Sequence, residues 1–176
     1  MFIKSIDGNG YRNIYAVGDL HGEITKLNAA LDDINFDKGQ DLLVSVGDLI
    51  DRGEDSIACL ELIGEPWFEV VMGNHEKMAY DAITKEDEDY LVHWFHNGGG
   101  WYLKADKVYA DTLIKKAALL PLIIELNYGD RNVVFCHADY PLDKFTYDDF
   151  KDSEMHLLWS RERIERSLEN ESTAIE

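Results

Sequence analysis

The sequence predicts an α/β fold with a central sheet flanked by helices, on the basis of three features of its first half. Short apolar runs at 13–17, 41–46 and 67–72 are each followed directly by a glycine. Segments with apolar residues at helical spacing separate these runs. Strands that are joined through crossover helices pair in parallel. We therefore expect a parallel sheet built from the three runs.

The elements of this half are predicted in the order strand, helix, strand, helix, strand, helix. The helices are expected at 23–34, 55–63 and 76–83. In each of them apolar side chains recur every three or four residues and form one face that can be buried against the sheet. In the first helix this face contains Leu27, Leu31 and Ile34.

The second half begins with a helical region at 85–120, interrupted at 97–100 by Asn-Gly-Gly-Gly, which we interpret as a helix end and a turn. Strands at 122–126 and 132–136 are predicted to form a hairpin around 127–130. A loop is expected after Pro141, followed by a short apolar stretch at 157–159 and a charged tail at 161–176. No linker divides the chain, so we expect a single domain over 1–176.

Composition narrows the possible partners and the compartment. Acidic residues outnumber basic ones by 35 to 17, giving a net charge of −18, which disfavours binding to a nucleic acid backbone. No apolar run is long enough for a membrane span, and the N-terminus lacks the pattern of a signal peptide. The two cysteines, Cys59 and Cys136, lie in apolar stretches and are interpreted as buried free thiols. We therefore expect a cytoplasmic protein.

Polar residues follow the three predicted parallel strands and the hairpin. The carboxyl ends of parallel strands meet at one edge of a sheet, so these residues should gather there. The candidate metal ligands are carboxylate, imidazole and amide groups: Asp19, His21, Asp48, Asn74 and His137. Such ligands suit divalent manganese, iron or zinc, and five of them exceed what one ion needs. The sequence therefore predicts two divalent ions bridged by one carboxylate.

Other residues of the same loops suit phosphate chemistry. Arg52 can bind phosphate oxygens through two N–H groups, and His75 can donate a proton to a departing alkoxide. Asp51 is a candidate to hold that imidazole in place. Two metal ions can clamp a phosphoryl group and activate water. Since no serine or cysteine nucleophile stands out, we predict hydrolysis of a phosphomonoester without a covalent intermediate.

Three motifs resemble the signatures of the PPP-type phosphoprotein phosphatases: GDLHG at 18–22, GDLIDRG at 47–53 and GNHE at 73–76. The stretches HWFHNGGGW at 93–101, CHADYP at 136–141 and WSRERI at 159–164 are similar to the lambda-phage branch of that family. The resemblance extends from about residue 11 to 164. It implies a calcineurin-like metallophosphoesterase fold and, as substrates, proteins or peptides phosphorylated on serine, threonine and sometimes tyrosine.

The resemblance also implies roles for individual residues. Asp19 and His21 would bind the first metal, Asp48 would bridge, and Asn74 and His137 would bind the second metal, with manganese the typical ion of this branch. Arg52, Arg161 and Asn74 would contact the substrate. His75 would act as the general acid with Asp51 as its partner. Asp139 is a candidate to orient His137.

One family feature does not occur in this sequence. The family has a later Gly-His-Thr signature whose histidine completes the second metal site, and no such motif follows His137 here. The strands that would normally follow in this family are not found either. We expect either a shortened chain or a second metal site that lacks one ligand and binds its ion weakly. Two alternatives remain: a dinucleoside polyphosphate hydrolase of the same family, whose relatives carry similar motifs, and a catalytically impaired metal or phosphate binder, to which the missing histidine points. His93 and His96 are interpreted as surface or packing residues rather than zinc ligands.

Overall fold

The computed structural model describes residues 2–140, 150–162 and 165. In these residues the strands are β1 (Ile3–Asp7), β2 (Ile14–Val17), β3 (Leu42–Ser45), β4 (Phe68–Val70), β5 (Ile123–Tyr128) and β6 (Arg131–Phe135). The helices are η1 (Gly8–Gly10), α1 (Ile24–Asp33), α2 (Ser56–Glu61), α3 (Asn74–Thr84), α4 (Glu88–His96), η2 (Gly99–Leu103), α5 (Lys107–Ala117) and α6 (Phe150–Trp159). The predicted loop at 142–149 and most of the predicted tail lie outside the described residues.

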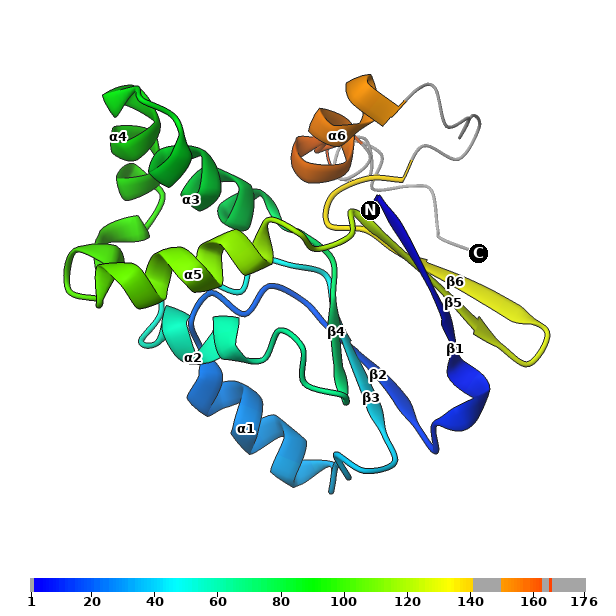
Figure 1. Ribbon diagram of the computed structural model, residues 1–176. Helices are drawn as coiled ribbons and strands as arrows, with labels where there is room; N and C mark the ends of the chain where they lie inside the picture. The colour runs from blue at the N-terminus through cyan, green and yellow to red at the C-terminus, as the bar shows by residue number, and fades with distance from the viewer. Residues whose placement is uncertain (1, 141–149, 163–164, 166–176) are drawn as a thin grey trace.

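The strands form two three-stranded sheets rather than one (Figure 1). The predicted parallel strands β2, β3 and β4 lie side by side in that order and all pair in parallel. The predicted hairpin of β5 and β6 is antiparallel, and β1 joins it through parallel pairing with β5. The α/β class, the parallel sheet and the hairpin are confirmed, whereas β1 was not predicted.

The β2–β3–β4 sheet is buried on both faces, and β3 shows why. Alternate side chains of a strand point to opposite faces. Leu43 packs with the helices in the largest apolar cluster, while Leu42 and Val44 pack with Ile6 and Ile124 of the other sheet. Helices α1 to α5 therefore cover one face and the β1–β5–β6 sheet covers the other, as Figure 1 shows. An unbroken apolar strand such as β3 requires this double cover.

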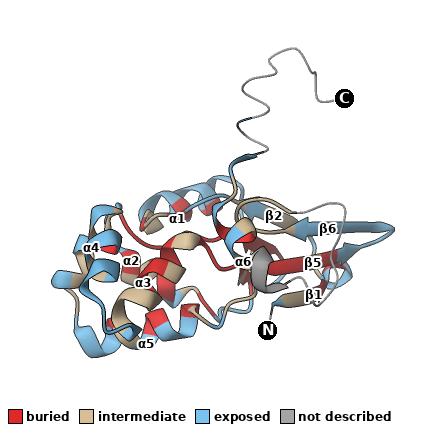
Figure 2. Ribbon diagram, turned by 90° about the horizontal axis from the view of Figure 1, so that it is seen from above, coloured by how far each residue is buried: buried red, intermediate tan, exposed pale blue. Residues whose placement is uncertain are grey.

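The outer face of the second sheet is covered by α6. Leu157 and Leu158 of this helix pack on Ile123, whose neighbour Ile124 points the opposite way into the space between the sheets. The predicted apolar stretch at 157–159 is thus the last turn of a helix. The result is a four-layer arrangement of helices, two sheets and one further helix, with buried residues concentrated in β3, β4 and β5 and on the inner helix faces, whereas β6 is exposed (Figure 2).

Three smaller predictions can be compared with the structure. Cys59 is a buried free thiol as predicted, whereas Cys136 is only half-buried. The break at 97–100 is confirmed, since α4 ends at His96 and Gly98 has a left-handed φ of 114°. Within the described part of the chain, every helix is too short or too polar to cross a lipid bilayer.

Asp41, just before β3, connects three parts of the chain. It accepts hydrogen bonds from the Arg12 guanidinium and from the backbone N–H groups of Asn13 and Asp37. The Arg12 bond lowers the pKa of Asp41 from 3.8 to about 2. Because the folded pKa is lower than the unfolded one, the ionised carboxylate stabilises the fold above pH 3.8 and this contribution is lost as the pH falls to about 2.

We therefore expect Asp41→Asn to lower the urea midpoint at pH 7, and the difference from the wild-type protein to shrink as the pH falls from about 4 to about 2. Urea unfolding followed by circular dichroism at several pH values measures both midpoints. A difference that stays constant down to pH 2 would contradict the ionic role of Asp41.

Candidate active site

The loops that leave β2 and β3 carry the candidate residues in an unusual backbone conformation. His21, Asp48, Asp51 and Arg52 have positive φ angles of 43°, 50°, 76° and 70°. Non-glycine residues adopt this left-handed region at an energetic cost, and such residues are concentrated at functional sites. Four of the five non-glycine residues of this kind in the described chain belong to the predicted site.

Gly47 allows the loops after β3 and β4 to touch. It has a φ of 99°, and a Cβ atom at this position would lie 2.6 Å from the backbone nitrogen of Gly73. No other residue could occupy the position without separating the two loops. Gly47, the glycine that follows β3, therefore also sets the distance between Asp48 and the loop of Asn74.

Glu76 joins the same two loops through its carboxylate. It is fully buried and accepts hydrogen bonds from the backbone N–H groups of Asp48, Leu49 and Gly73 at 2.8–2.9 Å. Burial and the neighbouring Asp48 carboxylate raise the pKa of Glu76 from 4.5 to about 7. No role was predicted for Glu76 from the sequence. A glutamate at the third position of a helix is nevertheless a known capping signal, and Glu76 has that position in α3.

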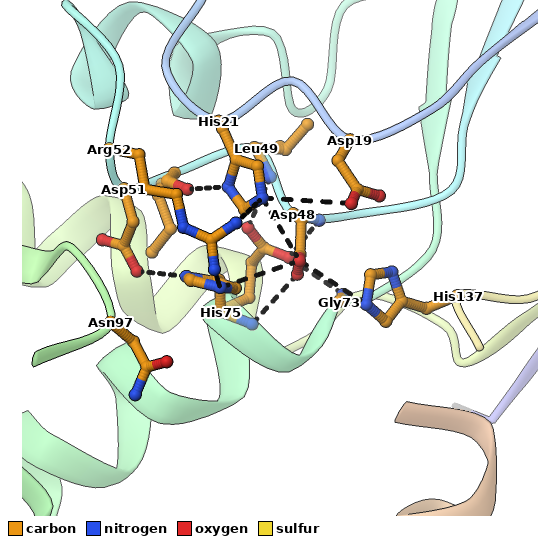
Figure 3. A network of polar contacts seen from close by, with 12 residues as sticks. Asp19, His21, Asp48, Leu49, Asp51, Arg52, Gly73, His75, Asn97 and His137 are labelled. Carbon is orange, nitrogen blue, oxygen red and sulfur yellow. Dashed lines mark hydrogen bonds and ion pairs between the residues drawn. The ribbon is translucent and has the colours of Figure 1, made fainter. Parts of the chain in front are cut away.

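Asp48 lies at the centre of the predicted ligands (Figure 3). Its Oδ2 is 3.6 Å from Nε2 of His137, 3.8 Å from Nε2 of His21 and 3.9 Å from Nε2 of His75. Asp19 lies beside them, with its Oδ2 3.9 Å from Nε2 of His21. Two groups in the described chain are close enough to hold a metal ion, Asp19–Asp48–His137 and His21–Asp48–His75, and Asp48 belongs to both.

Backbone carbonyl groups aim two of the imidazoles at this centre. Nδ1 of His21 lies 2.9 Å from the carbonyl oxygen of Ile50, and Nδ1 of His137 lies 2.8 Å from that of Val46. A histidine that donates Nδ1–H to a carbonyl presents an unprotonated Nε2 to a metal. Val46 thus holds His137, the role expected for Asp139, whose carboxylate instead lies 3.5 Å from His156.

The residues present fit a divalent cation. Oδ1 of Asn74 is buried and has no hydrogen-bond partner among the described residues, and a buried acceptor without a donor is costly unless a cation completes it. Asn74 is the first residue of α3, which begins two residues earlier than predicted. Carboxylate, imidazole and amide ligands of this kind suit borderline or hard divalent ions.

His75 and Asp51 form a buried pair, with Nδ1 of the histidine 2.6 Å from Oδ2 of the aspartate. Both side chains are almost completely buried. Asp51 also accepts hydrogen bonds from the indole N–H groups of Trp94 and Trp101. The structure thus places the predicted partner of His75 in contact with it and adds two tryptophans that the sequence analysis did not single out individually.

The two predicted phosphate-binding arginines differ in position. Arg52 is exposed, and its guanidinium lies 2.8 Å from Nε2 of His21 and 3.0 Å from Nε2 of His75. Arginine only donates, so both nitrogens act as acceptors in this arrangement. Arg161 is exposed and lies two residues after the end of α6, and no hydrogen bond or ion pair joins its side chain to the described site residues.

His93 and His96, which the sequence analysis kept apart from the metal site, are exposed in the last turn of α4. Neither belongs to a candidate metal cluster in the described part of the chain. Their interpretation as surface residues is consistent with this placement.

Comparison with known proteins relates this chain to phosphoesterases. Residues 12–174 match the profile of the calcineurin-like phosphoesterases. Serine/threonine-protein phosphatase 1 of Salmonella typhimurium is 42% identical over 165 residues, which are 92% of this chain and 74% of that protein. A symmetrical bis(5'-nucleosyl)-tetraphosphatase of Cellvibrio japonicus is 45% identical over 98 residues, but these are 46% of this chain and 36% of that protein.

A solved protein serine/threonine phosphatase from Saccharomyces cerevisiae has the same fold, with a TM-score of 0.56 and 20% identity. The match covers 86% of this chain, which spans about half of that chain (52%).

Proposed function

Because the chain belongs to the calcineurin-like phosphoesterase family, we propose that it is a metal-dependent phosphoprotein phosphatase acting on phosphoserine and phosphothreonine. The observation that carries this proposal is the cluster around Asp48, with Arg52 and His75 beside it. The high identity to a bacterial serine/threonine phosphatase over nearly the whole chain supports the protein substrate.

We assign the metal ligands as the sequence predicted them: Asp19 and His21 for one ion, Asn74 and His137 for the other, with Asp48 shared. The central position of Asp48 supports its place as the shared ligand, and the unpaired Oδ1 of Asn74 supports that residue as a ligand. The described residues group Asp19 with His137 and His21 with His75, so the division of ligands between the two ions rests on the family resemblance. Manganese is the ion we propose. When bound, two divalent ions would activate water and neutralise phosphate charge.

Arg52 binds the phosphate group in this proposal. Its guanidinium already lies between His21 and His75. Phosphate oxygens would accept hydrogen bonds from the N–H groups that now point to the two imidazoles. We propose Arg161 as a second contact on the strength of the family resemblance. A groove of about 420 Å³ adjoins Arg52 and includes Trp101 and Lys104, which leaves room for the residues that flank a phosphoserine.

His75 provides the proton for the leaving group. The oxygen of water attacks phosphorus, the ester P–O bond breaks, and the ester oxygen keeps the electron pair and takes a proton from Nε2 of His75. The proton that the attacking water loses reaches solvent, and solvent reprotonates His75. Asp51 holds the imidazole through Nδ1, so that Nε2 faces Arg52 and the phosphate.

The dinucleoside polyphosphate hydrolase remains the second candidate, since relatives with that name match about half of this chain. A comparison of two substrates separates the candidates. With manganese present, we expect a larger kcat/KM for a phosphoserine peptide than for diadenosine tetraphosphate. A preference for diadenosine tetraphosphate would overturn our choice, and a folded, manganese-loaded chain inactive on both would support a binding protein.

His75→Asn is the control in this experiment. We expect it to lower kcat by about 10²- to 10⁴-fold, because only the proton donor is removed. Manganese binding measured by calorimetry should stay close to that of the wild-type protein. A loss of manganese binding instead would make His75 a metal ligand, in keeping with its place in the His21–Asp48–His75 group.

A further inference from the structure

The segment HWFHNGGGW at 93–101 has no part in the chemistry described so far, yet it lies directly behind Asp51. The indole N–H of Trp94 donates to both carboxylate oxygens of Asp51, at 3.0 Å and 2.9 Å. The indole N–H of Trp101 donates to Oδ1 at 2.7 Å. With His75 on Oδ2, each oxygen of the carboxylate accepts two hydrogen bonds.

These donors hold the carboxylate without neutralising it. Trp94 and Asp51 are fully buried and His75 is 2% exposed, so water does not compete for the bonds. Among the described residues, His75 is the only ion-pair partner of Asp51, and no lysine or arginine pairs with it. A lysine or arginine in this place would compete with the His75 imidazole for the negative charge of Asp51. A neutral indole N–H fixes the position of the carboxylate oxygens and leaves their charge to pair with His75.

Two glycines keep the tryptophans close to Asp51. A Cβ atom on Gly99 would lie 2.7 Å from the Trp94 ring, and one on Gly98 would lie 2.8 Å from Cγ of Arg52. The carbonyl oxygen of Gly98 accepts a hydrogen bond from the backbone N–H of Arg52. The end of α4 and the start of η2 therefore pack against the Asp51–Arg52 turn with no room for a side chain between them.

We propose that Trp94 and Trp101 are positioning residues, which orient the Asp51 carboxylate so that His75 presents its proton to the leaving oxygen. The catalytic part of this inference rests on the proposed phosphatase function. Asp51 has the strained φ of 76°, so its backbone alone does not favour this orientation and the side-chain bonds have to maintain it.

The first test needs no activity and uses the metal-free protein. Its four tryptophans give four indole N–H signals in a ¹⁵N–¹H correlation spectrum. We expect Asp51→Asn to shift the signals of Trp94 and Trp101, assigned from single Trp→Phe variants, and to leave those of Trp67 and Trp159 unchanged. If neither the Trp94 nor the Trp101 signal moves, the inference is wrong, whatever reaction the chain catalyses.

The second test compares two esters that differ in their need for an acid. Phenol is as poor a leaving group as a tyrosine side chain, whereas the nitro group of p-nitrophenol stabilises the departing anion. We expect Trp101→Phe to lower kcat on phenyl phosphate on the order of tenfold and on p-nitrophenyl phosphate much less. KM should not change on either ester, because Arg52 is untouched and neither ester carries the flanking residues that the groove beside Trp101 would take.

Trp67→Phe is the matched control, since the indole N–H of Trp67, like that of Trp101, bonds to a carboxylate, that of Glu65, away from the site. It should change neither rate. Replacing Trp101 by benzothienylalanine, which has sulfur in place of the N–H, covers the case in which the phenylalanine variant misfolds. Equal losses on both esters, or no loss, would overturn the inference. A wild-type protein that hydrolyses neither ester would instead contradict the proposed function, and the spectra would still decide the inference.

Discussion

Asp48→Asn is expected to abolish tight manganese binding and to lower kcat on the order of a thousandfold or more, because it removes the charge shared by both candidate metal groups. Oδ2 of Asp48 lies within 3.9 Å of three imidazole nitrogens. Asparagine has the same size and can still accept the hydrogen bond that Oδ1 takes from the backbone N–H of His75. The fold should therefore survive the substitution.

Calorimetric titration with manganese and turnover of p-nitrophenyl phosphate measure the two effects of Asp48→Asn. Asp111→Asn is a suitable control, because Asp111 bonds to the hydroxyl of Tyr102 and belongs to neither metal group of the described residues. It should bind manganese like the wild-type protein. A folded Asp48→Asn variant with unchanged manganese affinity would contradict the shared-ligand role.

Glu76→Ala is expected to lower the free energy of unfolding by about 3 kcal/mol or more, because three buried backbone N–H groups lose their acceptor. Removal of a buried carboxylate also relieves its repulsion with Asp48, which is one reason for the raised pKa of Glu76. This relief offsets only part of the lost free energy of unfolding. Each unpaired buried N–H costs about 1–3 kcal/mol, and the substitution leaves three such groups without an acceptor. The loops of Asp48 and Gly73 should also separate, so manganese binding should weaken.

Urea unfolding and manganese titration check the Glu76 prediction together. Glu69→Ala is the matched control, because Glu69 pairs with Lys4 in a half-exposed salt bridge. Such a pair contributes about 0–1 kcal/mol, and its loss should not affect manganese binding. A Glu76→Ala variant as stable as Glu69→Ala would show that the two loops hold together without the glutamate.

The parallel strands and the gathering of polar residues at their ends could be predicted because both follow from local patterns. The apolar runs that form β2, β3 and β4 are each followed by a glycine and a polar residue. Parallel pairing of these strands then brings Asp19, Asp48 and Asn74 to one edge of the sheet. The strand β1 was missed because Ile3–Asp7 mixes apolar with polar residues and does not form an apolar run. Its pairing partner, β5, lies more than a hundred residues away in the sequence.

The sequence by itself determined which side chains are the candidates for the chemistry, since residue type and spacing decide which groups can bind a cation, a phosphate or a proton. Only the tertiary structure decided what holds those groups in place. Carbonyl groups of Val46 and Ile50 aim two imidazoles, Glu76 joins two loops, and Trp94 and Trp101 hold Asp51. A hydrogen bond depends on distance and direction in space, and residues 43 and 50 positions apart meet only once the chain has folded.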